Sequence, residues 1–154
     1  MNVDYSTLPA RWSRIIIDGD PGAAKTSLAK DMASQLGANR ISLDDYLQGN
    51  GNDYLLQLDY ARVRKDILDG GSKVLIEGIC LLKIMAKIRI GYDFHIFVKR
   101  LNGFVGWELE SYLNPKSTLP RSKADKDAVQ YYRECKPFAG CNLVLCHDVC
   151  DRRG

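Results

Sequence analysis

At 154 residues the chain has the length of one ordinary domain and is too short to bury two independent cores. Hydrophobic residues make up 45% and charged residues 27%, a balance of soluble globular proteins that excludes a disordered or membrane-embedded chain. The net charge of +3 comes without a long lysine or arginine cluster, so nothing indicates nucleic-acid or membrane binding. We expect a single domain, residues 1–154, for which small anions stay open as ligands.

The ends of the chain and its cysteines bear on its location. The first 20 residues hold no apolar run of signal-peptide length, and no stretch approaches the roughly 18 apolar residues of a membrane span. A cytoplasmic location is therefore expected, and the oligomeric state is left open. The five cysteines are interpreted as reduced thiols. A zinc site is less favoured, because the spacing lacks the paired ligands of familiar zinc modules; its ligands would be Cys141, Cys146, His147 and Cys150.

The first half of the chain alternates strand and helix patterns. The β-branched run Ile15–Ile17, followed by Asp18 and Gly19, is typical of a strand buried on both faces of a parallel sheet. From Lys25 onward apolar residues recur at four-residue steps, and Gly37 ends this predicted helix. There follow a strand at 39–43, a polar loop at 44–53, a helix at 59–70 and a strand at 73–78.

The second half continues this alternation with one irregular part. Residues 79–90 predict a helix with a wide apolar face, and residues 92–100 predict a strand. Gly103 and Gly106 argue against a helix before Trp107, so we expect a helix only around 107–113. A loop at 114–125, a helix at 124–136 and a strand at 141–148 follow. The alternation predicts a three-layer α/β sandwich with a mainly parallel sheet.

The segment after the first strand nearly matches a phosphate-binding loop. The pattern is met by Gly19, Lys25 and Thr26, while Ala24 stands where a second glycine is usual. Because the loop joins a buried strand to an amphipathic helix, its backbone N–H groups are expected to face phosphate. Lys25 would neutralise the outer phosphates as a catalytic residue, and Thr26 would offer its hydroxyl to Mg²⁺. The alternative is an ordinary turn. The predicted nucleotide-binding residues are Gly19, Asp20, Pro21, Gly22, Ala23, Ala24, Lys25, Thr26 and Ser27.

The alanine at the second glycine position is expected to have a partial cost. Its methyl group would crowd the β-phosphate or push the loop slightly open. Alanine is compatible with helical torsions, and Ala24 stands at a helix start, so the loop should still form. On this reasoning Ala24→Gly tightens ATP binding and slightly destabilises the free protein.

Acidic residues follow two other predicted strands. Asp44 and Asp45 come after the second strand, and Glu77 ends the third, just before Gly78. Because the carboxyl ends of parallel strands meet at one edge of a sheet, these side chains are expected beside the loop. A carboxylate there can accept the proton of an attacking hydroxyl or hold Mg²⁺ through water. Helix capping or simple solvation is the alternative for each.

Several motifs together resemble the uridine kinase and nicotinamide riboside kinase group of P-loop small-molecule kinases. The segments "GDPGAAKT", "ISLDDYL", "LDYARV", "VLIEG" and "YYRECKPFAGCNLVL" occur in that family's order and approximate spacing, over about residues 15–145. The resemblance implies a P-loop NTPase fold of the nucleoside kinase type. It also implies transfer of the γ-phosphoryl group of ATP, with Mg²⁺, to a hydroxyl of a nucleoside-like or other small metabolite.

The same resemblance implies roles for individual residues. Asp44 matches the family's base, which activates the acceptor hydroxyl, and Asp59 matches an aspartate that binds ribose hydroxyls. Glu77 matches the glutamate that assists Mg²⁺. An aromatic residue that stacks on the acceptor's base would be Tyr46 or Tyr54.

The chain departs from the family pattern in its lid and at Ala24. The family's lid carries several arginines, whereas residues 101–124 hold their cations at unfamiliar spacing; the predicted lid residues are Arg100, Arg121 and Lys123. Two alternatives stay open, a catalytically weak nucleotide-binding module that acts through a partner and a structural protein that keeps only the fold. Residues 44–59 hold four aspartates and no lysine or arginine, which favours a nucleoside over a strongly anionic acceptor.

Overall fold

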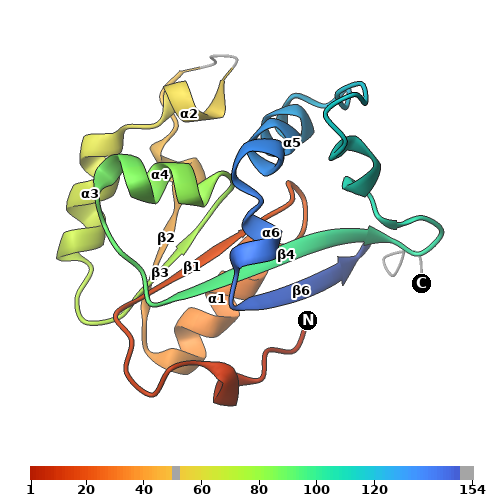
Figure 1. Cartoon of the computed structure of the whole chain (residues 1–154). Helices are drawn as coiled ribbons and strands as arrows, with labels where there is room; N and C mark the ends of the chain where they lie inside the picture. The colour runs from red at the N-terminus through yellow and green to blue at the C-terminus, as the bar shows by residue number, and fades with distance from the viewer. Residues whose placement is uncertain (50–52, 150–154) are drawn as a thin grey trace.

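A six-stranded sheet forms the centre of the computed structural model, which describes residues 1–49 and 53–149 (Figure 1). Five strands run parallel in the order β2-β3-β1-β4-β6. A two-residue strand, β5 (Gly106–Trp107), pairs antiparallel with the end of β4. The predicted mainly parallel sheet is confirmed. The parallel strands are β1 (Arg14–Gly19), β2 (Asn39–Ser42), β3 (Val74–Glu77), β4 (Phe94–Asn102) and β6 (Leu143–Asp148).

Helices cover both faces of the sheet (Figure 1). Helix α1 (Lys25–Leu36) lies on one face, and α3 (Tyr60–Asp69), α4 (Leu81–Ile88) and α5 (Lys123–Cys135) lie on the other. None of the helices in the described ranges is long and apolar enough to cross a membrane. The short elements are α2 (Tyr54–Gln57), α6 (Pro137–Gly140) and the 3-10 turns η1 (Tyr5–Thr7), η2 (Leu43–Tyr46) and η3 (Glu110–Tyr112).

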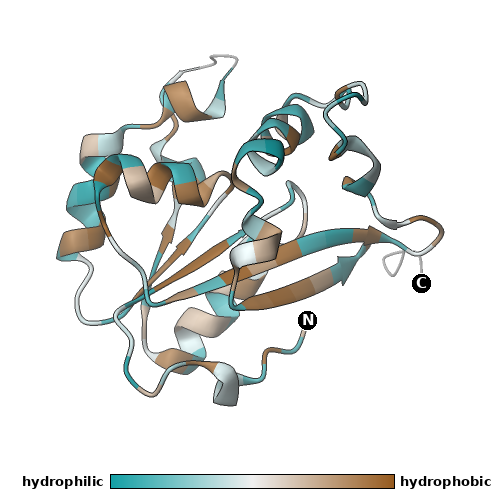
Figure 2. Cartoon of the chain, viewed as in Figure 1, coloured by the Kyte–Doolittle hydropathy of each residue, from teal (hydrophilic) through white to brown (hydrophobic). Residues whose placement is uncertain are grey.

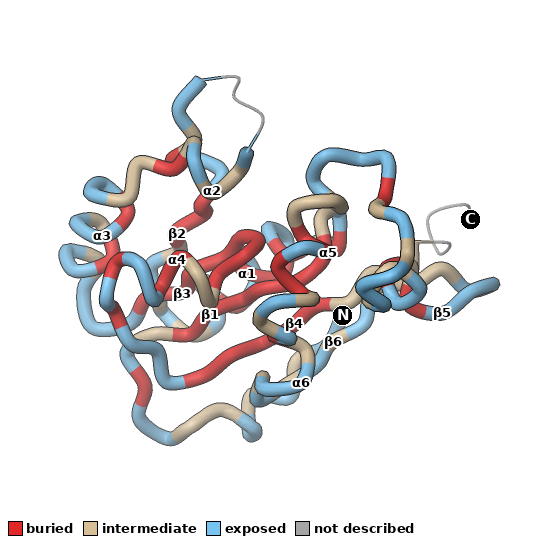
Figure 3. Tube along the Cα trace, turned by 45° about the horizontal axis from the view of Figure 1, so that its top comes forward, coloured by how far each residue is buried: buried red, intermediate tan, exposed pale blue. Residues whose placement is uncertain are grey.

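Alternate residues of the central strands enter two separate cores. Ile16 packs with Ile76 and Phe97 under α3, α4 and α5, whereas Ile15 and Ile17 pack with α1. Hydrophobic residues therefore follow the strands in Figure 2, and these strands are buried along most of their length in Figure 3. Burial on both faces explains why residues 15–17 of β1 are continuously apolar and not alternating. The predicted three layers are confirmed.

The residues before β1 complete the layer on the α1 face. Trp12 is buried there, and Val3, Tyr5 and Leu8 pack against the same core, together with Leu143 and Leu145 of β6. The sequence offered no prediction for this segment, because its apolar residues follow neither a helical nor a strand period.

The largest departure from the predicted elements lies in residues 101–113. The helix expected around 107–113 is wrong, because β4 extends to Asn102 and the chain returns as β5. Trp107 is held by tertiary contacts there: its ring packs against Phe97, and its indole N–H donates to Asp20 at 2.7 Å. Residues 110–112 form only a 3-10 turn. The predicted loop at 44–53 begins within η2, and its residues 50–52 lie outside the described ranges.

A buried histidine on β4 has a ring nitrogen without a hydrogen-bond partner among the described residues. His95 is 2% exposed, and its Nε2 has no partner in the part of the chain that the structure describes; the Asp18 carboxylate lies 3.8 Å away. Burial lowers the pKa of His95 to about 4, whereas an unfolded histidine titrates near 6.5. As the pH falls from about 6.5 to about 4, the unfolded chain therefore binds a proton that the folded chain does not, and stability is lost.

We expect His95→Leu to raise the free energy of unfolding by roughly 1–2 kcal/mol near neutral pH, because it removes an unsatisfied buried polar atom. The gain should grow as the pH is lowered to about 5, since the variant lacks the proton-linked loss. Urea denaturation of parent and variant at both pH values measures this. A gain that is equal at the two pH values contradicts the lowered pKa of His95.

Candidate functional site

The loop from Gly19 to Thr26 connects β1 to α1 at the carboxyl edge of the sheet. Gly19 has φ 140°, and a Cβ at this position would overlap the backbone carbonyl of Val98 on β4. The glycine is therefore required by the close approach of β4 to the start of the loop.

Ala24 has a left-handed backbone, with φ 59° and ψ 28°. The helical torsions that we expected for Ala24 are therefore wrong, and the expected destabilisation by glycine loses the reason on which it rested. A Cβ in this conformation costs about 1 kcal/mol, whereas glycine adopts it freely. Ala24 lies just outside the helix, as the N-cap of α1, so the helical torsions begin only at Lys25.

Lys25 is buried within the curve of the loop. Its side chain donates from Nζ to the backbone oxygens of Asp20 (2.6 Å) and Gly19 (3.2 Å). Burial lowers the pKa of Lys25, and four nearby carboxylates oppose this effect. A phosphate group in the loop would favour the charged ammonium in the same direction as these carboxylates.

Asp20 joins the loop to neighbouring elements of the fold through its side chain. Its carboxylate is fully buried and accepts hydrogen bonds from the hydroxyl of Tyr132, the backbone N–H of Arg100 and the indole of Trp107, each at 2.7 Å. Its backbone N–H donates to Val98 at 2.9 Å. Burial raises the pKa of Asp20, and the three hydrogen bonds oppose that rise. The side chain of Asp20, predicted to bind nucleotide, thus faces protein partners and does not line the cavity described below.

Asp18, near the end of β1, is held by α5 in a similar way. Its buried carboxylate accepts from the hydroxyl of Tyr131 at 2.5 Å and from the backbone N–H of Gly19 at 2.8 Å. Burial raises the pKa of Asp18 to about 6. Adjacent tyrosines on α5, Tyr131 and Tyr132, therefore hold two aspartates at the entry to the loop.

Oxygen groups meet at the start of α1 and the end of β3. Thr26 Oγ1 lies 3.0 Å from Glu77 Oε1, and the guanidinium of Arg40 lies 3.1 Å from the same carboxylate oxygen. An ionised carboxylate can only accept hydrogen bonds, so the Thr26 hydroxyl is the donor to Glu77. The lone pairs of the hydroxyl oxygen stay free for another ligand. Hydroxyl and carboxylate oxygens are the ligands that Mg²⁺ prefers. Thr26 and Glu77 therefore fit the metal role that the sequence predicted for them.

A cavity of about 560 Å³ joins these groups (a volume large enough for a small ligand). Asp44 and Tyr54 reach it from the segment after β2, and the Tyr54 hydroxyl donates to Asp44 Oδ1 at 3.1 Å. The structure thus brings together Lys25, Thr26 and Glu77 with two predicted substrate residues. The lining residues are Pro21, Gly22, Ala23, Ala24, Lys25, Thr26, Asp44, Leu47, Tyr54, Glu77, Gly78, Ile79 and Ala124.

Two other predicted substrate residues do not line this cavity. The hydroxyl of Tyr46 donates to Asp66 at 2.8 Å, which directs it to α3. Asp59 caps α3 by accepting from the backbone N–H of Arg62 at 3.1 Å, and its other oxygen accepts from Gln48. Of the two aromatic residues proposed to stack on a base, Tyr54 is therefore the one at the cavity.

The predicted lid cations also lie outside the cavity. Arg100 forms ion pairs with Glu108 and with Asp125 (3.2 Å), and it also donates to the backbone carbonyl of Pro21. Arg121 shares a separate hollow with Arg100, and Lys123 pairs with Asp127 at 2.7 Å. Within residues 101–124, Ala124 is the residue that lines the cavity.

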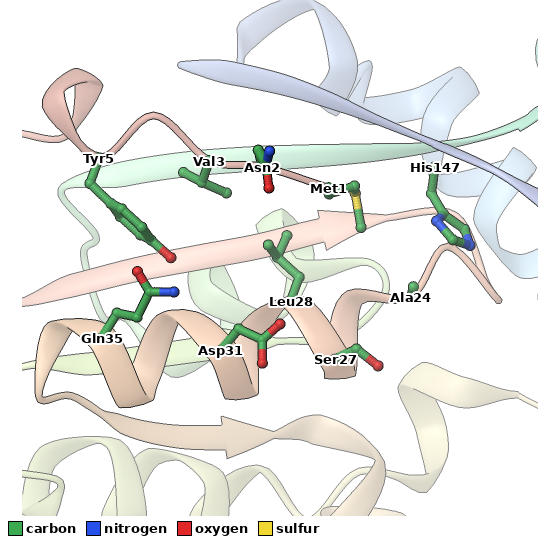
Figure 4. A pocket seen from close by; sticks show the side chains of 10 residues that line it. All are labelled: Met1, Asn2, Val3, Tyr5, Ala24, Ser27, Leu28, Asp31, Gln35 and His147. Atoms are coloured by element: carbon green, nitrogen blue, oxygen red, sulfur yellow. The ribbon is translucent and has the colours of Figure 1, made fainter.

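A second cavity, of about 510 Å³, lies between α1 and the N-terminal segment (Figure 4). Ala24 lines both cavities, so they meet at the loop. Sequence reasoning missed this one, because residues 1–5 carry no motif; only Ala24 and Ser27 had been predicted to bind a ligand. It is lined by Met1, Asn2, Val3, Tyr5, Ala24, Ser27, Leu28, Asp31, Gln35 and His147.

The alternative zinc site gains no support. Within residues 1–49 and 53–149, no three His, Cys, Asp or Glu side chains gather in a way that could hold a metal ion. Cys141 and Cys146 are free thiols, and the fourth candidate ligand, Cys150, lies outside the described residues.

Ala24→Gly is expected to stabilise the protein, since glycine removes the left-handed strain and the added freedom of the unfolded chain offsets only part of that gain. A net gain of about 0.5 kcal/mol would raise the melting temperature by about 1–2 °C in a chain of this size. Ala23→Gly is the matched control, because Ala23 is fully buried with an ordinary backbone and should lose stability. Calorimetric melting of the three proteins decides this; a lower melting temperature for Ala24→Gly would show that the strain is absent.

Comparison with known proteins shows the fold. No family model and no curated protein matches the sequence. A solved structure of a possible uridine kinase from Bacillus stearothermophilus superposes with a TM-score of 0.60 at 16% identity, over 89% of this chain and 90% of that chain. A gluconokinase from Sinorhizobium meliloti 1021 gives a TM-score of 0.51 at 15% identity, over 90% and 84%. The chain therefore has the mainly parallel α/β fold of the P-loop kinases.

Proposed function

We propose that the protein is an ATP-dependent kinase that transfers the γ-phosphoryl group to a hydroxyl of a nucleoside-like or other small metabolite. The observation that carries the proposal is the single cavity in which the loop lysine, the loop threonine and two carboxylates meet. Phosphoryl transfer needs this combination, because the transferred group is positioned by a cation and the attacking hydroxyl by a carboxylate.

The two cavities beside the loop suggest how both substrates fit. With its phosphates along the loop, ATP would place its nucleoside in the cavity of Figure 4, between α1 and residues 1–5. The acceptor would then occupy the cavity that contains Asp44 and Tyr54. Because Ala24 borders both cavities, the γ-phosphate would lie between the nucleoside of ATP and the acceptor.

The side chains have separate tasks in this reaction. Asp44 accepts the proton of the acceptor hydroxyl as its oxygen forms the new bond to phosphorus and the bond to ADP breaks. Tyr54 holds the Asp44 carboxylate by its hydrogen bond. Lys25 balances the phosphate charge. Mg²⁺, held by Thr26 and Glu77, would neutralise further negative charge on the phosphates.

The acceptor is proposed to be neutral or weakly charged. Asp44 lines the acceptor cavity, and the lid cations Arg100, Arg121 and Lys123 do not. Lys25, the lysine among the lining residues, is assigned to the phosphates of ATP, so an acceptor with its own phosphate would meet the Asp44 carboxylate without a further lining cation. A screen of ATP consumption over nucleosides, ribosides, pantothenate-like alcohols and sugars tests this. ATP binding without ADP formation in every reaction would instead favour a binding module that acts through a partner.

Lys25→Ala should abolish the stabilisation of the protein by ATP, because it removes the cation at the centre of the loop. Thermal melting with and without Mg²⁺ and ATP measures this effect. Lys30→Ala is the control, since Lys30 lies on the exposed side of the same helix and should leave the ATP-induced shift unchanged. An undiminished shift in Lys25→Ala would overturn the nucleotide-site assignment.

Asp44→Asn should leave ATP binding nearly intact and lower turnover by roughly 10²-fold or more, as expected when a base is lost and its shape is kept. The comparison with Asp45→Asn isolates the effect, because Asp45 is also exposed but does not line the cavity. Initial rates with a responsive acceptor provide the readout. If Asp44→Asn keeps at least half of the parent rate, Asp44 is not the base.

A further inference from the structure

The side chain of Arg40, on the edge strand β2, contacts Glu77 at the proposed Mg²⁺ site. On β2, Arg40 is in register with Leu75 of β3, two residues before Glu77. Side chains two residues apart share one face of a sheet, so Arg40, Leu75 and Glu77 lie on the α1 face. The guanidinium Nη1 is 3.1 Å from Glu77 Oε1, and the Arg40 side chain is 25% exposed. Arg40 does not itself line the cavity.

The two oxygens of Glu77 have different surroundings. Oε1 accepts from both Arg40 and Thr26, whereas Oε2 has no hydrogen-bond partner within the described part of the chain. Glu77 is 3% exposed and lines the cavity. Two donors on one oxygen fix the rotation of the carboxylate and leave the other oxygen for a ligand in the cavity. A buried carboxylate without such partners would be costly.

We propose that Arg40 is a positioning residue for the divalent cation: by holding Glu77 Oε1, it keeps the carboxylate in the orientation that binds the metal or its water. The inference rests on the proposed function. Carboxylates at metal sites are commonly held by a second ring of hydrogen bonds, and loss of such a partner typically weakens metal binding about 10–100-fold.

The charge of Arg40 acts in the opposite direction. A guanidinium near a cation site repels the metal, so its removal alone would tighten metal binding. Solvent screens this repulsion, because Arg40 is partly exposed at the sheet edge. The hydrogen bond to the buried Glu77 is local and is not screened in the same way. We therefore expect the positioning effect to exceed the repulsion.

The test measures Mg²⁺ binding instead of turnover. Mg²⁺ is titrated by calorimetry into protein saturated with a non-hydrolysable ATP analogue. In Arg40→Met the dissociation constant for Mg²⁺ should rise about tenfold or more. The affinity for the analogue in EDTA should stay within about twofold of the parent, because Arg40 does not line the cavity. An unchanged or tighter Mg²⁺ constant in Arg40→Met overturns the proposal.

Arg40→Gln separates geometry from charge. Glutamine keeps a planar N–H donor without the charge, so it should recover at least about threefold of the affinity lost in Arg40→Met. A glutamine variant that binds Mg²⁺ no better than the methionine variant also counts against positioning. If Arg40→Met does not fold, the glutamine variant is compared directly with the parent and should lie within about threefold of it.

Lys65→Met is the control for a lost surface cation. Lys65 is exposed and pairs with Asp69 on α3 at 2.9 Å, so its loss should not change Mg²⁺ binding. A parent protein that fails to bind the ATP analogue removes the proposed function and this inference with it. A parent that binds the analogue and Mg²⁺, with an Arg40→Met variant that matches it, removes the inference alone.

Discussion

The Asp20 carboxylate is the contact on which the geometry of the loop depends. It is fully buried, and its three donors come from the end of β4, from β5 and from α5. A buried carboxylate that loses a donor suffers a desolvation cost of several kcal/mol. The entry to the loop is therefore coupled to β4, β5 and α5 through one buried carboxylate.

The same contacts anchor both ends of residues 101–124, the segment that the sequence predicted to be a lid. Arg100 precedes the segment and Asp125 follows it, and their ion pair at 3.2 Å joins the two ends directly beside the loop. Tyr131 and Tyr132 then fix α5 to β1 through Asp18 and Asp20. Trp107 ties the first part of this segment to Asp20 as well, so the part of the segment that these anchors leave free is residues 108–124.

The sequence could predict what local patterns determine. The isoleucine run of β1 and the four-residue period of α1 define their own elements, and the parallel-strand rule placed Glu77 beside Thr26. The partners of Asp20 could not be predicted, because they lie 80 to 112 positions away in the chain. Arg40 was missed for the same reason, since its meaning depends on strand register and not on any motif.

The backbone conformation of Ala24 is a feature of the loop that local sequence patterns did not predict. A helix normally begins from an extended residue, but α1 and α4 both begin from a left-handed non-glycine residue, Ala24 (φ 59°) and Cys80 (φ 60°). Each costs about 1 kcal/mol or more and persists only where surrounding contacts determine the backbone. Ala24 lines the proposed active-site cavity, and Cys80 directly follows Ile79, which also lines it. Two of the four left-handed non-glycine residues in the described ranges thus lie at the cavity or next to a residue that lines it, whereas the other two, Arg89 and Lys136, follow the C-terminal ends of α4 and α5.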